Sequence, residues 1–274
     1  MKIKYLGTAA YEGIPSLFCQ CETCRKSLEL GGKNLRSRSQ AIINDDLLLD
    51  FPPDTVWHFQ RFGLDWRKIT NCLITHSHSD HFYPEDIQMI RKDYCHVSDY
   101  RINYYGGDSI YQTLNNIIEK EKDKYLDMSI TKVSAGKIYQ VGKYMVMPLN
   151  ANHGLESTPL FYAISDGTKK VLYAHDTGYF SEESWNYLKG FGKFDLVSLD
   201  CTGATQSGWV NGHMCVETNI KLFEKMKELG LIDDNTKKVI NHFSHNGQAT
   251  YDETYEYVKD LGIIVSYDGL EIEI

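Results

Sequence analysis

The residues with the clearest chemical potential in this chain are three histidines and an aspartate grouped in one short stretch. The stretch reads Thr75-His76-Ser77-His78-Ser79-Asp80-His81, which has the pattern H-x-H-x-D-H. Imidazole and carboxylate together form the ligand set of catalytic zinc and its neighbouring divalent metals. In an extended segment His76 and His78 point the same way, while Asp80 and His81 come after the chain turns and can serve a second ion. The alternative is a polar, solvated loop, which this concentration of ligand types disfavours.

A strand and a helix are expected on either side of this stretch. The run Asn71-Cys72-Leu73-Ile74 is apolar and typical of a buried strand. Pro84, followed by two acidic residues, is a helix-start signal. The ligand candidates therefore lie in a loop held between two regular elements, where catalytic groups concentrate.

Single His and Asp residues recur at the ends of other strand-like runs. Apolar runs end shortly before His153, Asp176 and His242, and another ends at Asp200. If these strands share a sheet, their ends share an edge and the side chains converge there. Such a set suits two divalent ions about 3.5–4 Å apart, with a water activated for attack on phosphorus or a carbonyl. Taken alone, His153 fits an ordinary loop histidine at least as well as a ligand.

At this point the sequence resembles the metallo-β-lactamase superfamily. The resemblance rests on the motif at 76–81 and on the later single residues in the superfamily's order, and it covers the chain from Gly7-Thr8 to Asp268-Gly269. It implies an α+β fold, the four-layer αβ/βα sandwich, with a two-metal hydrolase site. It assigns His76, His78 and His153 to one ion, Asp80, His81 and His242 to the other, and Asp176 as the bridge. Zinc or manganese is expected, and iron or nickel is also accepted by these ligands.

A second group of candidate ligands lies near the N-terminus. Cys19, Cys21 and Cys24 are three of the seven cysteines, and three thiolates are one short of a tetrahedral structural zinc. His245, three residues after His242, is a natural fourth ligand. Within the superfamily, C-x-C-x-x-C with a later H-x-x-H resembles the phosphodiesterases of the carbon–phosphorus lyase pathway, which open a cyclic ribose phosphate. The alternative is three free, buried thiols.

The same resemblance extends to His213, which precedes an expected helix. The family places a general acid there, so we expect His213 to protonate the leaving alkoxide and to reach a bound ligand without reaching the ions. Asp80 is the other residue expected to take part in catalysis. A surface-loop histidine is the alternative for His213. Three further histidines have no motif around them and are expected to be surface or packed residues: His58, His96 and His175.

Length and composition are those of a globular protein. The chain has 274 residues, 42% of them hydrophobic and 24% charged, and we expect a single hydrolase domain over 1–274. It has no signal-peptide h-region and no apolar run near the ~20 residues of a membrane span, so a cytoplasmic protein without a membrane partner is expected. The net charge of -8 favours a small-molecule phosphodiester over nucleic acid as partner. The oligomeric state is left open, and a homodimer is allowed.

Turn signals predict several further elements. Strand pairs are expected on either side of 44–46, of Asp166-Gly167 and of Asp268-Gly269, the last as a closing hairpin. Thr250 and Glu253 form a capping-box pattern before a helix. The Tyr-rich segment 94–105 either lines a substrate cleft or packs under a long loop.

The resulting hypothesis is a dinuclear metal phosphodiesterase that acts on a small nucleotide or ribose phosphodiester, for example a cyclic one. A transfer-RNA 3′-processing nuclease of the same superfamily would need a basic RNA-docking arm, and no suitable insertion is visible in the sequence. A lactone, lactam or thioester hydrolase could use the same metals, and His213 argues against it. A non-catalytic, zinc-stabilised binding protein would have lost metal ligands, and none is lost here.

Overall fold

Among the residues that the computed structural model describes, the strands form two sheets of seven strands each. The model describes the chain except residues 97–98, 121–122, 125–126, 155 and 157. The first sheet runs in the order β14 (Glu271–Glu273), β1 (Lys2–Gly7), β2 (Gln40–Ile43), β3 (Leu47–Leu49), β4 (Asn71–Leu73), β5 (Arg101–Gly106) and β6 (Asp127–Lys132). The second runs in the order β13 (Ile263–Val265), β12 (Lys237–Asn241), β11 (Leu196–Asp200), β10 (Lys170–Ala174), β9 (Leu160–Ser165), β8 (Tyr144–Asn150) and β7 (Tyr139–Val141).

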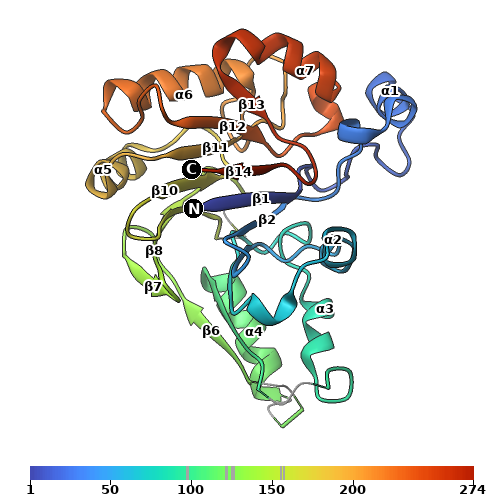
Figure 1. Ribbon diagram of the computed structural model, residues 1–274, viewed down its shortest axis with the longest axis vertical. Coiled ribbons are helices and arrows are strands. Elements are labelled where there is room, and N and C mark those ends of the chain that lie inside the picture. The colour runs from blue at the N-terminus through green and yellow to red at the C-terminus, as the bar shows by residue number, and fades with distance from the viewer. Residues whose placement is uncertain (97–98, 121–122, 125–126, 155, 157) are drawn as a thin grey trace.

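Helices cover the outer faces of both sheets (Figure 1). The first sheet is covered by α2 (Thr55–Phe62), α3 (Pro84–Ile87) and α4 (Asp108–Lys120), and the second by α5 (Glu182–Phe191), α6 (Val216–Glu228) and α7 (Tyr251–Val258). The predicted four-layer αβ/βα sandwich is therefore confirmed. The remaining helix, α1 (Glu22–Leu30), follows the cysteine cluster and projects to one side. Among the described residues, no helix is long and apolar enough to cross a membrane.

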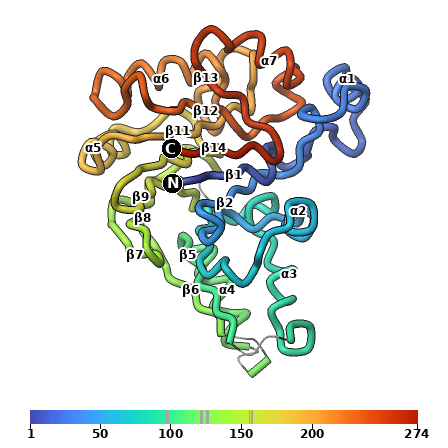
Figure 2. The backbone as a smooth tube through the Cα atoms, viewed as in Figure 1, coloured from blue at the N-terminus to red at the C-terminus, as the bar shows by residue number. Residues whose placement is uncertain are grey.

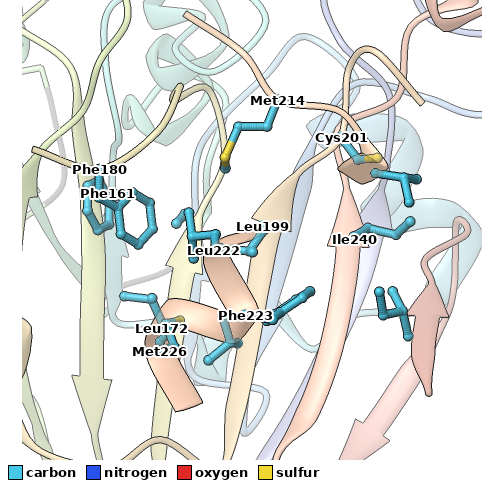
Figure 3. Close-up of a cluster of buried hydrophobic side chains, with 14 of the residues drawn as sticks. Phe161, Leu172, Phe180, Leu199, Cys201, Met214, Leu222, Phe223, Met226 and Ile240 are labelled. Atoms are coloured by element: carbon cyan, nitrogen blue, oxygen red, sulfur yellow. The ribbon is translucent and has the colours of Figure 1, made fainter. Parts of the chain in front are cut away.

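The strands are apolar on both faces because each sheet lies between two cores. In β10, Val171 and Tyr173 belong to the core between the sheets, whereas Leu172 and Ala174 belong to the core beneath the helices. This alternation is the period of two that a strand imposes. Figure 3 shows the helix-side core, where Leu172, Leu199 and Ile240 of the sheet lie near Leu222, Phe223 and Met226 of α6. The loops at the edge of the second sheet therefore extend from strands that are buried on both faces.

Most of the predicted turns connect the expected partners. The strands on either side of 44–46 pair as β2 and β3, and those on either side of Asp166-Gly167 pair as β9 and β10, both antiparallel. Thr250 and Glu253 form the predicted capping box at the start of α7. These elements are local in sequence, which is why turn chemistry predicts them.

The predicted closing hairpin at Asp268-Gly269 is wrong. β13 pairs with β12 in the second sheet, whereas β14 pairs with β1 in the first. The turn instead carries the chain between the sheets, and Asp268 fixes it by accepting hydrogen bonds from Thr8 Oγ1 and the Ser37 N–H, both at 2.7 Å. The two chain ends then lie side by side, as Figure 2 shows, with the Ile274 N–H donating to Met1 O at 2.9 Å.

Candidate metal centre and its pocket

Both sheets contribute loops to the candidate site. The H-x-H-x-D-H loop follows β4 of the first sheet, whereas His153, Asp176 and His242 follow β8, β10 and β12 of the second. The condition that these strands share a sheet therefore holds for those before His153, Asp176 and His242 but not for the strand before the motif. The site forms where the strand-end loops of the two sheets meet.

The first group of ligand atoms joins the motif to the loop after β8. His76 Nε2 lies 3.0 Å from His78 Nδ1, and His153 Nε2 lies 3.1 Å from the same His78 atom. The ligand nitrogens of these three residues all lie within 4.8 Å of one another. Because ring nitrogens that share a centre need a proton or a cation between them, the group suits a metal ion.

The second group consists of buried side chains that converge on Asp176. His81 Nε2 lies 2.6 Å from Asp176 Oδ2 and 3.3 Å from Asp80 Oδ2. His242 Nε2 lies 3.3 Å from His81 Nε2. The same Asp176 oxygen is 3.4 Å from His76 Nε2 in the first group. One carboxylate thus contacts both groups, which is the position expected of a bridging ligand.

Four of these imidazoles present one nitrogen to the cluster and the other to an outer partner. The outer contacts of Nδ1 are Asp50 Oδ2 for His81 (2.7 Å), Thr202 Oγ1 for His242 (2.9 Å), Thr75 Oγ1 for His76 (3.0 Å) and Gly212 O for His153 (3.1 Å). Such partners fix the orientation of metal-binding rings. Asp50 also accepts the Thr75 N–H at 2.7 Å, so it holds both ends of the motif loop.

Asp176 carries a buried charge that hydrogen bonds do not fully satisfy. Burial alone raises the pKa of Asp176, but the rings of His242 and His81 hold it well below its usual range. Asp176 Oδ1 makes no well-directed hydrogen bond, although His213 Nδ1 lies 3.2 Å and His242 Nε2 lies 3.3 Å away. An unpaired buried oxygen is costly, so this atom suits a cation.

Three residues of the site have left-handed backbones. Asp50, Asp176 and His242 have φ values of 67°, 50° and 64°. Residues other than glycine adopt this region at a cost on the order of 1–3 kcal/mol each, and such residues gather at functional sites. Each lies immediately beyond the end of a strand or two residues after it, where the turn directs its side chain into the cluster.

A pocket of about 400 Å³ opens onto the cluster. Its lining combines ligand candidates with polar and aromatic side chains: Ala10, Tyr11, Glu12, His78, Ser79, Asp80, His153, Asp176, Thr202, Trp209, His213, His242, Ser244 and Asn246. This volume lies in the range of small-molecule sites. The pocket therefore suits a small ligand whose reacting group lies on the cluster.

His213 lies closer to the cluster than the sequence suggests. Its Nδ1 is 3.2 Å from Asp176 Oδ1 and 3.1 Å from Asp200 Oδ2, so the ring contacts a candidate metal ligand, and its reach to a bound ligand without reaching the ions stays a prediction. The cause is Asp200, which ends β11 and accepts the Met214 N–H at 2.9 Å, drawing the loop inward. Burial lowers the pKa of His213, but Asp200 and Asp176 outweigh burial and raise it to about 11.

The cysteine cluster and His245 come together as predicted for a tetrahedral site. The ligand atoms of Cys19, Cys21, Cys24 and His245 lie within 4.8 Å of one another, and His245 Nδ1 is 3.3 Å from Cys19 Sγ. Backbone N–H groups donate to the sulfurs, including Cys24 N–H to Cys21 Sγ and Ser16 N–H to Cys24 Sγ, both at 3.4 Å. Such donors stabilise thiolates.

Cys21 and Cys24 differ in how readily their thiols ionise. Burial raises the pKa of Cys21, but the Cys24 N–H and His245 outweigh it and lower the pKa to about 6. Burial raises the pKa of Cys24 to about 12, with the neighbouring sulfurs adding to the effect. Of these two thiols, Cys21 is therefore the one that would more readily attract a cation as a thiolate.

We expect Cys21→Ser to lower the melting temperature and to release one zinc ion, because structural zinc contributes directly to folding. Each kcal/mol lost should lower the midpoint by roughly 2–4 °C in a chain of this size. Calorimetry and metal analysis check this, with Cys95→Ser, a half-buried thiol outside the cluster, as the control. A Cys21→Ser protein with wild-type zinc content and melting temperature would remove Cys21 from the site.

The three histidines without a motif stay outside both ligand groups. His58 is buried, with Nδ1 2.7 Å from Gln40 Oε1. His175 is also buried, with Nε2 2.8 Å from Ser198 Oγ, and His96 is exposed. The expectation of surface or packed histidines is confirmed.

The Tyr-rich segment contributes to a different cavity. Tyr100 and Tyr104 line an apolar space of about 390 Å³ between α2, α3 and β5. None of the described residues of 94–105 lines the pocket at the metal cluster, and residues 97 and 98 lie outside the description. The described part of the segment therefore does not line the pocket at the metal cluster.

Several residues of the pocket have no recognisable pattern in the sequence. Thr202 Oγ1 lies 3.1 Å from His213 Nδ1, and its only sequence signal is that it closely follows the strand-end Asp200. Glu12, Tyr11 and Trp209 come from irregular loops, and nothing in their neighbourhoods marks them as pocket residues.

Comparisons with known proteins agree with this geometry. A family model described as a beta-lactamase superfamily domain matches residues 47–262. Exodeoxyribonuclease YycJ of Bacillus anthracis is 24% identical over 142 residues, which are 51% of this chain and 48% of that protein. The chain thus spans about half the length of this curated relative.

Solved structures extend the likeness over the whole chain. A diphosphatase of the PhnP family is 19% identical, with a TM-score of 0.76 over 100% of this chain and 98% of the other. Zinc-bound PqqB of Methylobacterium extorquens is 17% identical, with a TM-score of 0.74 over 100% of both chains. Human short-form tRNase Z is 15% identical, with a TM-score of 0.67 over 100% and 99%.

The family match fits the donor groups of the site. The fold of this family implies divalent metal ions, and the imidazole and carboxylate groups around Asp176 form a donor set suited to them. The chain therefore belongs to the β-lactamase superfamily and has the metallo-β-lactamase fold.

Proposed function

We propose that this protein is a dinuclear metal-dependent phosphodiesterase that hydrolyses a small nucleotide or ribose phosphodiester, for example a cyclic one. His76, His78 and His153 would hold one ion, Asp80, His81 and His242 would hold the other, and Asp176 would serve both groups. The observation that carries the proposal is the position of Asp176 Oδ2, which lies 3.4 Å from His76 Nε2 and 2.6 Å from His81 Nε2.

The chemistry that two divalent ions would supply here is the same as in other two-metal hydrolytic sites. Two divalent ions held there would supply a water nucleophile near neutral pH and would stabilise the charge that develops on the phosphorus oxygens. Asp80 belongs to this machinery as an ionised ligand: burial raises its pKa, but His81 outweighs burial and lowers it to about 2. A third, structural zinc is assigned to Cys19, Cys21, Cys24 and His245.

His213 is the residue that favours a phosphodiesterase over a lactone or thioester hydrolase. Its Nδ1 makes the contacts to Asp176, Asp200 and Thr202, so Nε2 is the nitrogen available to a ligand in the pocket. The carboxylates of Asp200 and Asp176 raise the pKa of His213, which favours the protonated ring. A positioned imidazolium can protonate an alkoxide as the bond from phosphorus to oxygen breaks.

The choice of a small phosphorus substrate has further support. Three of the compared proteins are named for phosphate chemistry, as a diphosphatase, an exodeoxyribonuclease and a tRNase. The pocket volume of about 400 Å³ suits a small ligand, and the net charge of -8 disfavours a long polyanion.

The test is turnover of bis(4-nitrophenyl) phosphate by protein loaded with manganese or zinc, compared with a lactone and a thioester under the same conditions. We expect metal-dependent release of nitrophenolate and little turnover of the acyl substrates. Turnover of the lactone or thioester with no diester hydrolysis would contradict the proposal. If the protein prefers structured RNA to all small diesters, the nuclease reading would replace the small-diester proposal.

A further inference from the structure

One wall of the pocket also contacts the histidine of the cysteine site. Glu12 lines the pocket beside Ser244 and Asn246. Its Oε1 accepts a short hydrogen bond from Ser244 Oγ and lies 3.5 Å from His245 Nε2. His245 turns its other nitrogen, Nδ1, toward Cys19 Sγ and Cys21 Sγ at 3.3 and 3.5 Å. A carboxylate on the outer nitrogen of a metal-binding histidine fixes that ring, and the ring fixes the carboxylate.

Backbone hydrogen bonds also hold the loop that carries Glu12. The Ala10 N–H donates to Phe243 O at 2.9 Å, and the Phe243 N–H donates to Thr8 O at 2.9 Å. The loop that carries Glu12 is thereby fastened to the loop that carries both His242 and His245. The pocket wall and the two candidate metal centres form one connected unit.

One oxygen of Glu12 remains for a ligand. Both of the contacts above use Oε1, and within the described part of the chain no hydrogen bond uses Oε2. The side chain keeps 24% of its surface exposed, in the pocket. A carboxylate accepts hydrogen bonds and donates none. Its charge also repels a phosphate group, so Glu12 faces a part of the substrate that carries donors and no negative charge.

We infer that Glu12 is the specificity-determining residue of the pocket, where Oε2 accepts hydrogen bonds from the hydroxyl groups of a ribose-type diol on the alcohol part of the substrate. Asn246 adds an exposed amide at the same wall, and amides and carboxylates together suit sugar hydroxyls. This inference rests on the proposed phosphodiesterase function and names the feature of the substrate that the enzyme recognises.

The test uses two substrates that differ only in the diol: uridine 5′-(4-nitrophenyl) phosphate and its 2′,3′-dideoxy counterpart. Because both substrates release the same nitrophenolate, a difference in KM between them reports recognition of the diol and not a difference in the leaving group. In Glu12→Gln we expect KM for the ribose substrate to rise about 10- to 100-fold, the size of a lost hydrogen bond to a charged group. KM for the dideoxy substrate and kcat for both should change little.

Two controls separate recognition from support of the fold. Glu22→Gln makes the same charge change beside the cysteines, on a residue paired with Lys26 at 2.8 Å and outside the pocket, and should leave both substrates unaffected. Calorimetric binding of uridine 5′-monophosphate and its 2′,3′-dideoxy form gives a readout without turnover, and the same preference should be lost in Glu12→Gln. Zinc retained after mild chelation should stay at the wild-type level in both variants.

The outcomes are distinct. If Glu12→Gln weakens both substrates equally, or releases zinc, Glu12 acts only through His245 and the inference fails while the proposed function stands. If the wild type hydrolyses both substrates with equal KM, no diol is recognised and the inference fails alone. If the wild type hydrolyses neither of these nor bis(4-nitrophenyl) phosphate, the proposed function fails and the inference fails with it.

Discussion

Asp176→Ala should lose both catalytic ions and should reduce diester turnover by about 10³-fold or more, because the ions supply several kcal/mol of transition-state stabilisation. Asp176 Oδ2 contacts both ligand groups, and Oδ1 is buried without a hydrogen bond of its own. Metal analysis and turnover of bis(4-nitrophenyl) phosphate check this. Asp176→Asn, which keeps the shape of the side chain, confirms that the loss does not arise from a cavity.

Asp80→Ala is the matched comparison for that result. Asp80 contacts His81 in the second group, with 3.3 Å between Oδ2 and Nε2, so its loss should weaken one ion and leave the other bound. The zinc at the cysteine cluster should remain in both variants. An Asp176→Ala protein as active as the wild type, or one that loses a single ion as Asp80→Ala does, would exclude Asp176 as the bridge.

His213→Ala should slow hydrolysis of an alkyl or ribose diester by about 10²–10⁴-fold, the usual contribution of a general acid. A nitrophenyl ester should be almost unaffected, because nitrophenolate is a weak base and leaves without a proton. The wild-type rate on the alkyl diester should fall as the pH rises past the pKa of His213, which Asp200 and Asp176 raise. This alkaline limb should be absent from the pH profile of the variant.

The contacts of His213 call for a second variant, since Nδ1 lies 3.2 Å from Asp176 and 3.1 Å from Asp200. In His213→Asn the amide N–H can replace Nδ1–H on Asp200, but no proton reaches the leaving group. The selective loss on alkyl diesters should persist, with metal content unchanged. Equal losses on both esters, or loss of an ion, would make His213 a metal ligand or a support and not an acid.

The sequence predicts the ligand positions because those signals are local. Three of the imidazoles lie within six residues, and the single residues His153, Asp176 and His242 follow strand ends that hydrophobic runs mark. Burial of β10 on both faces makes its apolar run continuous and easy to recognise. The overall fold followed from the order of these motifs and not from the periodicity alone.

What the sequence does not predict depends on contacts between distant segments. Glu12 meets Ser244 across 232 residues, and Asp50 meets His81 across 31. The turn at Asp268 looks like a hairpin locally, and only the pairing of β14 with β1 reveals a crossing between sheets. His213 is drawn onto Asp176 by Asp200, a residue 13 positions away. No local pattern encodes these distances.

The measurement that tests the two-ion account most directly is diester turnover as a function of bound metal. Protein stripped by mild chelation, with its cysteine-bound zinc retained, is titrated with manganese, and turnover of bis(4-nitrophenyl) phosphate is followed together with metal content. The account predicts activity that rises to a plateau at two manganese ions per chain beyond the single zinc. Full activity at one ion per chain, or turnover independent of added metal, would contradict it.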